Sequence, residues 1–300
     1  MTKLSELVRR SNTFKPLTKI LEDVHRMAQV QKEQLRATLL SDPKHLDPKR
    51  LNRYELQHFS QNGEDGIIAE IFHRISTEGK VFVEIGAGDG LENNTAYLLI
   101  QGWTGFWFDA GPTYKRMQEN ASRYITANRV VVSEEFLTAE NVAATLERVG
   151  VPKQIDLLSV DIDRNTSFVW KALAAWRPRA AIIEYNPAFS PSDSWEVSYQ
   201  PKLAWNGTLY YGASLLKLEE IGREMGYVLV GCGMAGVNAF FVREDLVGDK
   251  FSAPFTARNH YEPPRHYLST QRVFKQGFDD CELVGQYGAI AKQGRNGKLV

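Results

Sequence analysis

The chain has 300 residues, its 36 lysines and arginines are balanced by 36 aspartates and glutamates, and 43% of its residues are hydrophobic. This composition is typical of a globular protein with a substantial core, and it excludes a mainly disordered chain. A formal net charge of zero argues against non-specific nucleic-acid binding, which requires a large positive field. We therefore expect no nucleic acid among the partners.

Residues 1–54 predict a helical extension that precedes the main domain. Apolar residues recur at helical spacing from Leu17 to Leu35, and the two prolines in residues 41–50 end this helix. Three interpretations stay open: a helix packed on the chain's own surface, a helix that joins copies into a homo-oligomer, and a helix on a membrane surface. Acidic residues on the polar face, such as Glu22 and Asp23, disfavour the third.

Between residues 55 and 250 the sequence alternates between strand and helix patterns. Short β-branched runs predict strands, and helical patterns separate them, in the order helix 60–75, strand 80–90, helix 94–102, strand 104–110, helix 112–124, strand 129–136, helix 140–150, strand 155–163, helix 166–176, strand 179–187 and helix 211–227. Two further apolar runs, around a glycine-rich turn, predict a final hairpin. We therefore expect an α/β fold with a doubly wound, seven-stranded sheet whose last strand is antiparallel. Residues 251–300 predict a C-terminal tail.

The cysteines and the apolar runs indicate the compartment. Cys232 and Cys281 form no CxxC pattern, which disfavours both a disulfide framework and a thiolate zinc site. No run of residues is apolar over the ~18 positions of a membrane span, and the first residues lack the apolar core of a signal peptide. We expect a cytoplasmic protein without a membrane span.

A glycine-rich loop, residues 84–90 (EIGAGDG), follows the first predicted strand. Such a turn lets a ligand approach the backbone closely. The dinucleotide fingerprint GxGxxG would require a third glycine where this chain has Leu91. Asp109 ends the next strand, about 20 residues beyond the loop, where an acid can accept hydrogen bonds from both hydroxyls of a ribose. Alternatively, Asp109 caps the helix that starts near Pro112.

Six segments together resemble the FkbM-type family of S-adenosylmethionine-dependent methyltransferases, over roughly residues 55–245. They are SQNGEDGII, FVEIGAGDG, LLSVDIDRNTSFVWKAL, IIEYNP, YYGASLLKLEEIGREMGYVLVGC and GVNAFFVRED. The resemblance implies a class I methyltransferase (Rossmann-like) fold, S-adenosylmethionine as the methyl donor, and O-methylation, often of a sugar hydroxyl.

The resemblance also implies which residues bind the donor. Glu84, Gly86, Ala87 and Gly88 would face the methionine part, Asp109 would bind the ribose, Ser133 and Glu134 would lie near the adenine, and Asp161 would also contact the cofactor. Three positions depart from the family pattern: Arg164 stands where we expect glycine, Thr166 where we expect aspartate, and Asp109 where we expect glutamate. Arg164 brings a large cation to the site and puts the acceptor specificity in doubt.

Oxygen-bearing side chains follow two neighbouring strands of the predicted sheet. Asp161 and Asp163 end the fourth strand, and Glu184 and Asn186 end the fifth. Because the carboxyl ends of parallel strands meet at one crevice, these side chains are expected to lie together and to suit Mg²⁺ or Mn²⁺. A similar arrangement in catechol-type O-methyltransferases binds a cation that activates the acceptor hydroxyl. The alternative is that Asp161 contacts the cofactor while Asp163 and Glu184 pair with arginines.

The long segment 187–212 is rich in aromatic residues, which suit the face of a sugar acceptor. We assign Arg164, Trp195, Tyr199 and Tyr211 to the acceptor side; alternatively, the segment is a lid packed on its own aromatic rings. His260 is the candidate catalytic base beside Asp161, since methyl transfer to a hydroxyl requires removal of a proton. Two rival functions remain: an inactive nucleotide- or sugar-binding scaffold of the same fold, and an N-methyltransferase.

Overall fold

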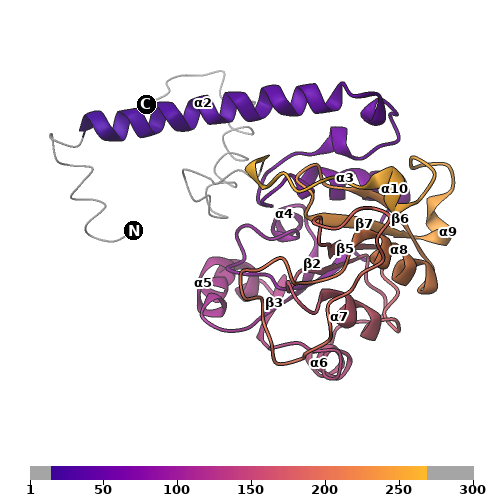
Figure 1. Ribbon diagram of the computed structural model, residues 1–300. Helices are drawn as coiled ribbons and strands as arrows, with labels where there is room; N and C mark the ends of the chain where they lie inside the picture. Colours follow the sequence, from indigo (N-terminus) through magenta and orange to yellow (C-terminus); the bar gives the residue numbers. More distant parts are fainter. Residues whose placement is uncertain (1–14, 269–300) are drawn as a thin grey trace, which may run out of the picture. The chain divides into compact units, whose positions relative to one another are not determined.

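The computed structural model describes residues 15–268 (Figure 1). Cys281 and most of the predicted C-terminal tail lie outside the described residues. The chain divides into two units, the first ending at Asp47 and the second beginning at Pro48. None of the described helices combines the length and the apolar character that a membrane span requires.

The first unit contains the predicted N-terminal helix. Helix α2 spans Lys15–Leu40, and a 3-10 turn, Pro43–His45, follows it. The side chain of Asp42 accepts a hydrogen bond from the backbone N–H of Lys44 and so caps this turn. Along α2, the apolar side chains of Ile20, Leu21, Val24, Met27 and Val30 are exposed.

The second unit contains a seven-stranded sheet and the helices that flank it (Figure 1). The strands are β1 Val81–Ile85, β2 Thr104–Asp109, β3 Val130–Glu134, β4 Leu157–Val160, β5 Ala180–Glu184, β6 Tyr227–Cys232 and β7 Asn238–Arg243. The helices are α3 Glu64–Ile75, α4 Ala96–Ile100, α5 Thr113–Thr126, α6 Val142–Val149, α7 Thr166–Ala172, α8 Leu215–Glu224, α9 Glu244–Val247 and α10 Ala257–His260. Two further 3-10 turns are Asn52–Tyr54 and His266–Leu268.

The order of the strands across the sheet is β3-β2-β1-β4-β5-β7-β6. All neighbouring pairs are parallel except those of β7, which runs antiparallel to both β5 and β6. This topology confirms the predicted doubly wound sheet of the class I methyltransferase fold. The direction of the strand order reverses between β1 and β4, and ligands of open α/β sheets bind beyond the carboxyl ends of the strands at such a point.

Alternating side chains of the strands form one hydrophobic cluster on each face of the sheet. Phe82, Trp107 and Leu157 pack in one cluster, while their neighbours Val83, Phe108 and Leu158 pack in the other. Every residue of β4 and β5 is buried. Helices on both faces therefore explain why these strands are continuous apolar runs in the sequence. Leu51 and Phe251 also pack in the first cluster.

Helix α8 starts later than the sequence predicts, at Leu215 rather than at residue 211. The preceding residues pair with the long segment instead, because Ala213 forms a β-bridge with Glu196 and the carbonyl of Gly212 accepts from the N–H of Val197. Ser214 then caps the helix by accepting a hydrogen bond from the N–H of Lys217. The long segment is thus tied to the sheet where α8 begins.

Candidate functional site

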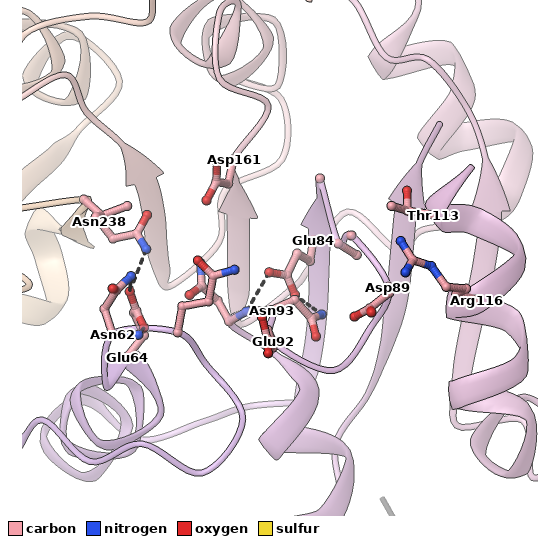
Figure 2. Close-up of a pocket in the computed structure, with 16 residues that line it drawn as sticks. Asn62, Glu64, Glu84, Asp89, Glu92, Asn93, Thr113, Arg116, Asp161 and Asn238 are labelled. Carbon is pink, nitrogen blue, oxygen red and sulfur yellow. Dashed lines mark hydrogen bonds between the residues drawn. The ribbon is translucent and has the colours of Figure 1, made fainter. Parts of the chain in front are cut away.

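A cavity of about 280 Å³ lies at the carboxyl ends of β1 and β4, at the point where the strand order reverses (Figure 2). Its walls come from the glycine loop, the loop at 92–94, the segment before and at the start of α3, the first turn of α5, the end of β4 and the start of β7. Figure 2 shows Asn62, Glu64 and Asn238 on one side of the site, and Asp89, Thr113 and Arg116 on the other. Of the residues predicted to bind the donor, Glu84, Gly86, Ala87, Gly88 and Asp161 line this cavity.

The glycine loop has a backbone that requires glycine for two different reasons. Gly86 has φ +88°, and a Cβ there would lie 1.7 Å from the carbonyl oxygen of Asp161. Gly88 has φ +59°, and a Cβ there would meet nothing within 4 Å. Gly86 therefore lets β1 and the end of β4 approach closely. Gly88 is needed only for its left-handed backbone conformation, since a side chain there would have room. Ala87 between them lines the cavity and also packs in the first hydrophobic cluster.

Asp109 joins the glycine loop to the start of α5. Its Oδ2 accepts a hydrogen bond of 2.6 Å from the N–H of Gly88, and its Oδ1 accepts from the N–H of Ala110 and the hydroxyl of Thr113. Asp109 is not among the residues that line the cavity, and its binding of a ribose stays a prediction. Ser133 and Glu134 are paired in register with Phe108 and Asp109 at the end of β3, also outside the lining.

Glu84 is 1% exposed and organises the loop beside the cavity. Its carboxylate accepts hydrogen bonds from the side chain of Asn93, from the N–H groups of Asn94 and Thr95, and from the hydroxyl of Thr95. Burial raises the pKa of Glu84 to about 7, against the opposing effect of these hydrogen bonds. Both carboxylate oxygens of Glu84 thus accept hydrogen bonds from described residues of the loop, and Glu84 thereby holds this part of the cavity wall in place.

Three carboxylates meet at the ends of β4 and β5. One oxygen from each of Asp161, Asp163 and Glu184 lies within 4.8 Å of the others. The carboxyl groups of Asp161 and Glu184 are close enough to influence each other's pKa, and a proton on one of them would relieve their repulsion. Burial raises the pKa of all three, and repulsion between the carboxylates raises those of Asp161 and Glu184 further. The cluster is therefore suited to hold a proton between two carboxylates or a divalent cation among three.

Two residues predicted near this cluster differ in their surroundings. The pKa of Tyr211 is raised by burial and by the charges of Glu184, Asp163 and Asp161, so its hydroxyl lies in the field of the cluster. The amide of Asn186, predicted as a metal ligand, donates to the carbonyls of Leu209 and Tyr211, and its oxygen accepts from the N–H of Ala188. Asn186 therefore holds the long segment in place.

The charges that line the cavity are mainly negative. Five carboxylates, those of Glu64, Glu84, Asp89, Glu92 and Asp161, line it together with one guanidinium, that of Arg116. Such a cavity attracts cationic groups and repels phosphates.

The long segment 187–212 is anchored to α7 and to the loop before it. The guanidinium of Arg164, which is 6% exposed, lies over the ring of Tyr210 and donates to the carbonyls of Tyr210 and Ser198. The amide of Asn165 donates to the carbonyls of Gln200 and Leu203. The large cation that departs from the family pattern thus holds this segment.

The remaining candidates of the acceptor side and the candidate base take other places. Trp195 stacks on Phe189, and the hydroxyl of Tyr199 donates to Glu140, so both rings take part in packing of the segment. His260 is buried in α10 and is not one of the residues that line the cavity. Its role as catalytic base stays a prediction.

Sequence reasoning missed several residues of the cavity, namely Asn62, Glu64, Asn93, Arg116 and Asn238. Asn62, Glu64 and Asn238 belong to the segments SQNGEDGII and GVNAFFVRED, which carry the family resemblance. The family resemblance of these segments is the signal that points to the three residues, because their spacing in the sequence matches no known motif.

Comparison with known proteins finds likeness in fold. No family model and no curated protein matches the chain. A magnesium protoporphyrin IX methyltransferase from Synechocystis, with bound SAH, is 15% identical over 71% of this chain and 99% of its own, with a TM-score of 0.42. An O-methyltransferase family protein from Burkholderia thailandensis is 13% identical over 69% of this chain and 70% of its own, with a TM-score of 0.38. These likenesses concern the fold, which the strand order already establishes.

Proposed function

We propose that this chain is an S-adenosylmethionine-dependent O-methyltransferase that acts on a hydroxyl of a sugar or of a related natural-product precursor. The observation that carries the proposal is the acidic cavity over Gly86 and Gly88 at the reversal of the strand order. The resemblance of the surrounding segments to FkbM-type methyltransferases supports it.

The charge of the cavity favours this donor over a dinucleotide. A sulfonium donor carries positive charge, which the acidic lining would attract, whereas the pyrophosphate of NAD would be repelled. Leu91 also stands where the dinucleotide fingerprint requires glycine.

The chain's own residues would position the reactants and take the proton. When bound, the donor supplies an electrophilic methyl group to a nearby oxygen. Asp161 and Glu184 would orient the acceptor hydroxyl and accept its proton, since a carboxylate of raised pKa is a stronger base near neutral pH. Holding donor and acceptor in line can contribute an effective molarity on the order of 10⁵ M.

A divalent cation fits the same carboxylates. Asp161, Asp163 and Glu184 offer an all-oxygen donor set, and Oε2 of Glu184 is buried without a hydrogen-bond partner among the described residues. These residues would hold Mg²⁺ or Mn²⁺, and the cation would lower the pKa of the acceptor hydroxyl. The alternative is the proton shared between Asp161 and Glu184 without a metal.

Calorimetric titration tests the proposal. The chain should bind S-adenosylhomocysteine and fail to bind NAD, and it should transfer labelled methyl groups to a hydroxyl within a panel of sugars and glycosides. Absence of binding would reject the methyltransferase function. Binding without turnover on any acceptor would favour the inactive scaffold, and turnover only on amines would favour an N-methyltransferase.

The compartment and the assembly are part of the same proposal. The two cysteines of the sequence form no CxxC pattern, which supports a reducing compartment such as the cytoplasm. The exposed apolar side chains of α2 support a homo-oligomer formed through that helix.

A further inference from the structure

Two asparagines of the cavity each have a buried amide oxygen without a partner. Asn93 is 8% exposed and Asn238 is 3% exposed, and both line the cavity. Among the described residues, neither Oδ1 has a hydrogen-bond donor. Because a buried acceptor without a partner costs free energy, these two oxygens indicate a ligand with hydrogen-bond donors.

The orientation of both amides follows from the carboxylates behind them. Nδ2 of Asn93 donates to Glu84 at 2.6 Å, and Nδ2 of Asn238 donates to Glu64 at 2.9 Å. A carboxylate accepts hydrogen bonds, so turning either amide over would place two acceptors against each other. The unpartnered atoms are thus oxygens in both cases.

The two acceptors belong to different parts of the cavity wall. Asn93 lies in the loop after β1, whereas Asn238 begins β7 and is paired in register with Glu184 of β5. The N–H and amide groups of Asn62 also donate to Glu64, which fixes the carboxylate that orients Asn238 (Figure 2). A group with several donors can satisfy both oxygens, and the acidic lining favours one with positive charge.

We propose that Asn93 and Asn238 bind the α-ammonium group of the methyl donor's amino-acid end through their amide oxygens. This inference rests on the proposed function. An ammonium group has three N–H donors and a positive charge, whereas the sulfonium centre has no donor to offer. The ribose hydroxyls are expected at Asp109 of β2, and β1, β4 and β5 separate β2 from β7 in the sheet.

Binding of two related ligands tests this assignment. S-adenosylhomocysteine has the amino-acid end, and 5′-methylthioadenosine lacks it. In calorimetric titrations, Asn93→Ala and Asn238→Ala should each weaken binding of S-adenosylhomocysteine by about tenfold or more and leave that of 5′-methylthioadenosine unchanged. The control is Asn52→Ala, since Asn52 is also a buried asparagine, donates to the carbonyl of Cys232 and does not line the cavity. It should bind both ligands like the unaltered chain.

Two outcomes would overturn the assignment: unchanged binding of S-adenosylhomocysteine by both variants, or an equal loss for both ligands. A measurement on the unaltered chain covers the case in which the variants do not fold. It should bind S-adenosylhomocysteine at least tenfold more tightly than the desamino analogue, which keeps the carboxylate, and equal affinities would overturn the assignment. If the unaltered chain binds S-adenosylhomocysteine but the variants behave as the control does, the inference fails while the proposed function stands. If it binds none of these ligands, both fail.

Discussion

The backbone N–H of Gly88 donates a hydrogen bond of 2.6 Å to Oδ2 of Asp109, which couples the glycine loop of β1 to the end of β2. The same carboxylate accepts from the hydroxyl of Thr113 in the first turn of α5. One side chain therefore fixes two of the segments that surround the cavity. A bound ribose would share this carboxylate with them, because each carboxylate oxygen can accept more than one hydrogen bond.

We expect Asp109→Asn to reduce the affinity for S-adenosylhomocysteine by about tenfold or more, because the amide loses a charge and one acceptor oxygen. Calorimetric titration measures this loss. Asp245→Asn is the control, since Asp245 forms an exposed ion pair with Arg243 away from the cavity. An Asp109→Asn variant that binds as tightly as this control would show that Asp109 only supports the loop.

The two substitutions Gly86→Ala and Gly102→Ala separate backbone strain from close packing. Both glycines have a positive φ, +88° and +90°, but a Cβ on Gly86 would overlap the carbonyl of Asp161, whereas one on Gly102 would meet nothing within 4 Å. We expect Gly102→Ala to lower the free energy of unfolding by about 1 kcal/mol and Gly86→Ala to lower it by about 3 kcal/mol or more. Denaturant unfolding measures both. Equal losses would mean that the end of β4 moves away at little cost.

The raised pKa of Glu84 predicts a stability that falls with pH. Burial raises this pKa from 4.5 to about 7, so between these values the folded chain keeps a proton that the unfolded chain releases. The contribution of Glu84 to stability is then fully present below the unfolded pKa and is lost as the pH rises through about 7. As the pH rises from 5 to 8, the unaltered chain should lose about 1 to 3 kcal/mol of its free energy of unfolding relative to the Glu84→Gln variant. A difference that is independent of pH would mean that the four hydrogen bonds keep Glu84 ionised throughout.

Metal removal distinguishes the two interpretations of the carboxylate cluster. If Asp161, Asp163 and Glu184 hold a cation, exhaustive chelation should lower methyl transfer by about a hundredfold, and added Mg²⁺ or Mn²⁺ should restore it. Asp163→Asn should raise the metal concentration needed for recovery. Asp193→Asn, an exposed position whose carboxylate accepts from the N–H of Ser190, should not. Activity that survives chelation undiminished would favour the shared proton.

The sequence predicts the individual strands of the sheet well because each strand produces a local pattern of residues. The β-branched runs, the glycine loop and the acids at the strand ends are each visible within a few neighbouring residues. Glu84, Gly86, Gly88 and Asp161 belong to these patterns, and the structure places all four in the lining of the cavity. The start of α8 was predicted wrongly because Ala213 pairs with Glu196, and helical periodicity carries no information about that pairing.

The part of the site that the sequence does not reveal depends on contacts between distant segments. Asn238 reaches Glu64 across 174 residues, and this pair forms only because β7 is inserted between β5 and β6. Likewise, the role of Arg164 becomes evident only once Tyr210 of the long segment packs against it. A spacing rule cannot express such contacts, since they are set by the topology of the whole sheet.

Arg164 provides the last prediction, because its guanidinium holds the long segment together with Lys171, which forms an ion pair with Glu196. Residues 202–210 are exposed, and Arg164 contacts two carbonyls of the segment and the ring of Tyr210. We expect Arg164→Ala to release this stretch, so that trypsin cleaves after Lys202 about tenfold faster, as followed by mass spectrometry. The affinity for S-adenosylhomocysteine should stay unchanged, while the KM for the acceptor should rise if the segment contributes to the acceptor site. An unchanged rate of cleavage would show that the hydrogen bonds from Asn165 and the contacts of Glu196 with Ala213 and Lys171 suffice to hold the segment.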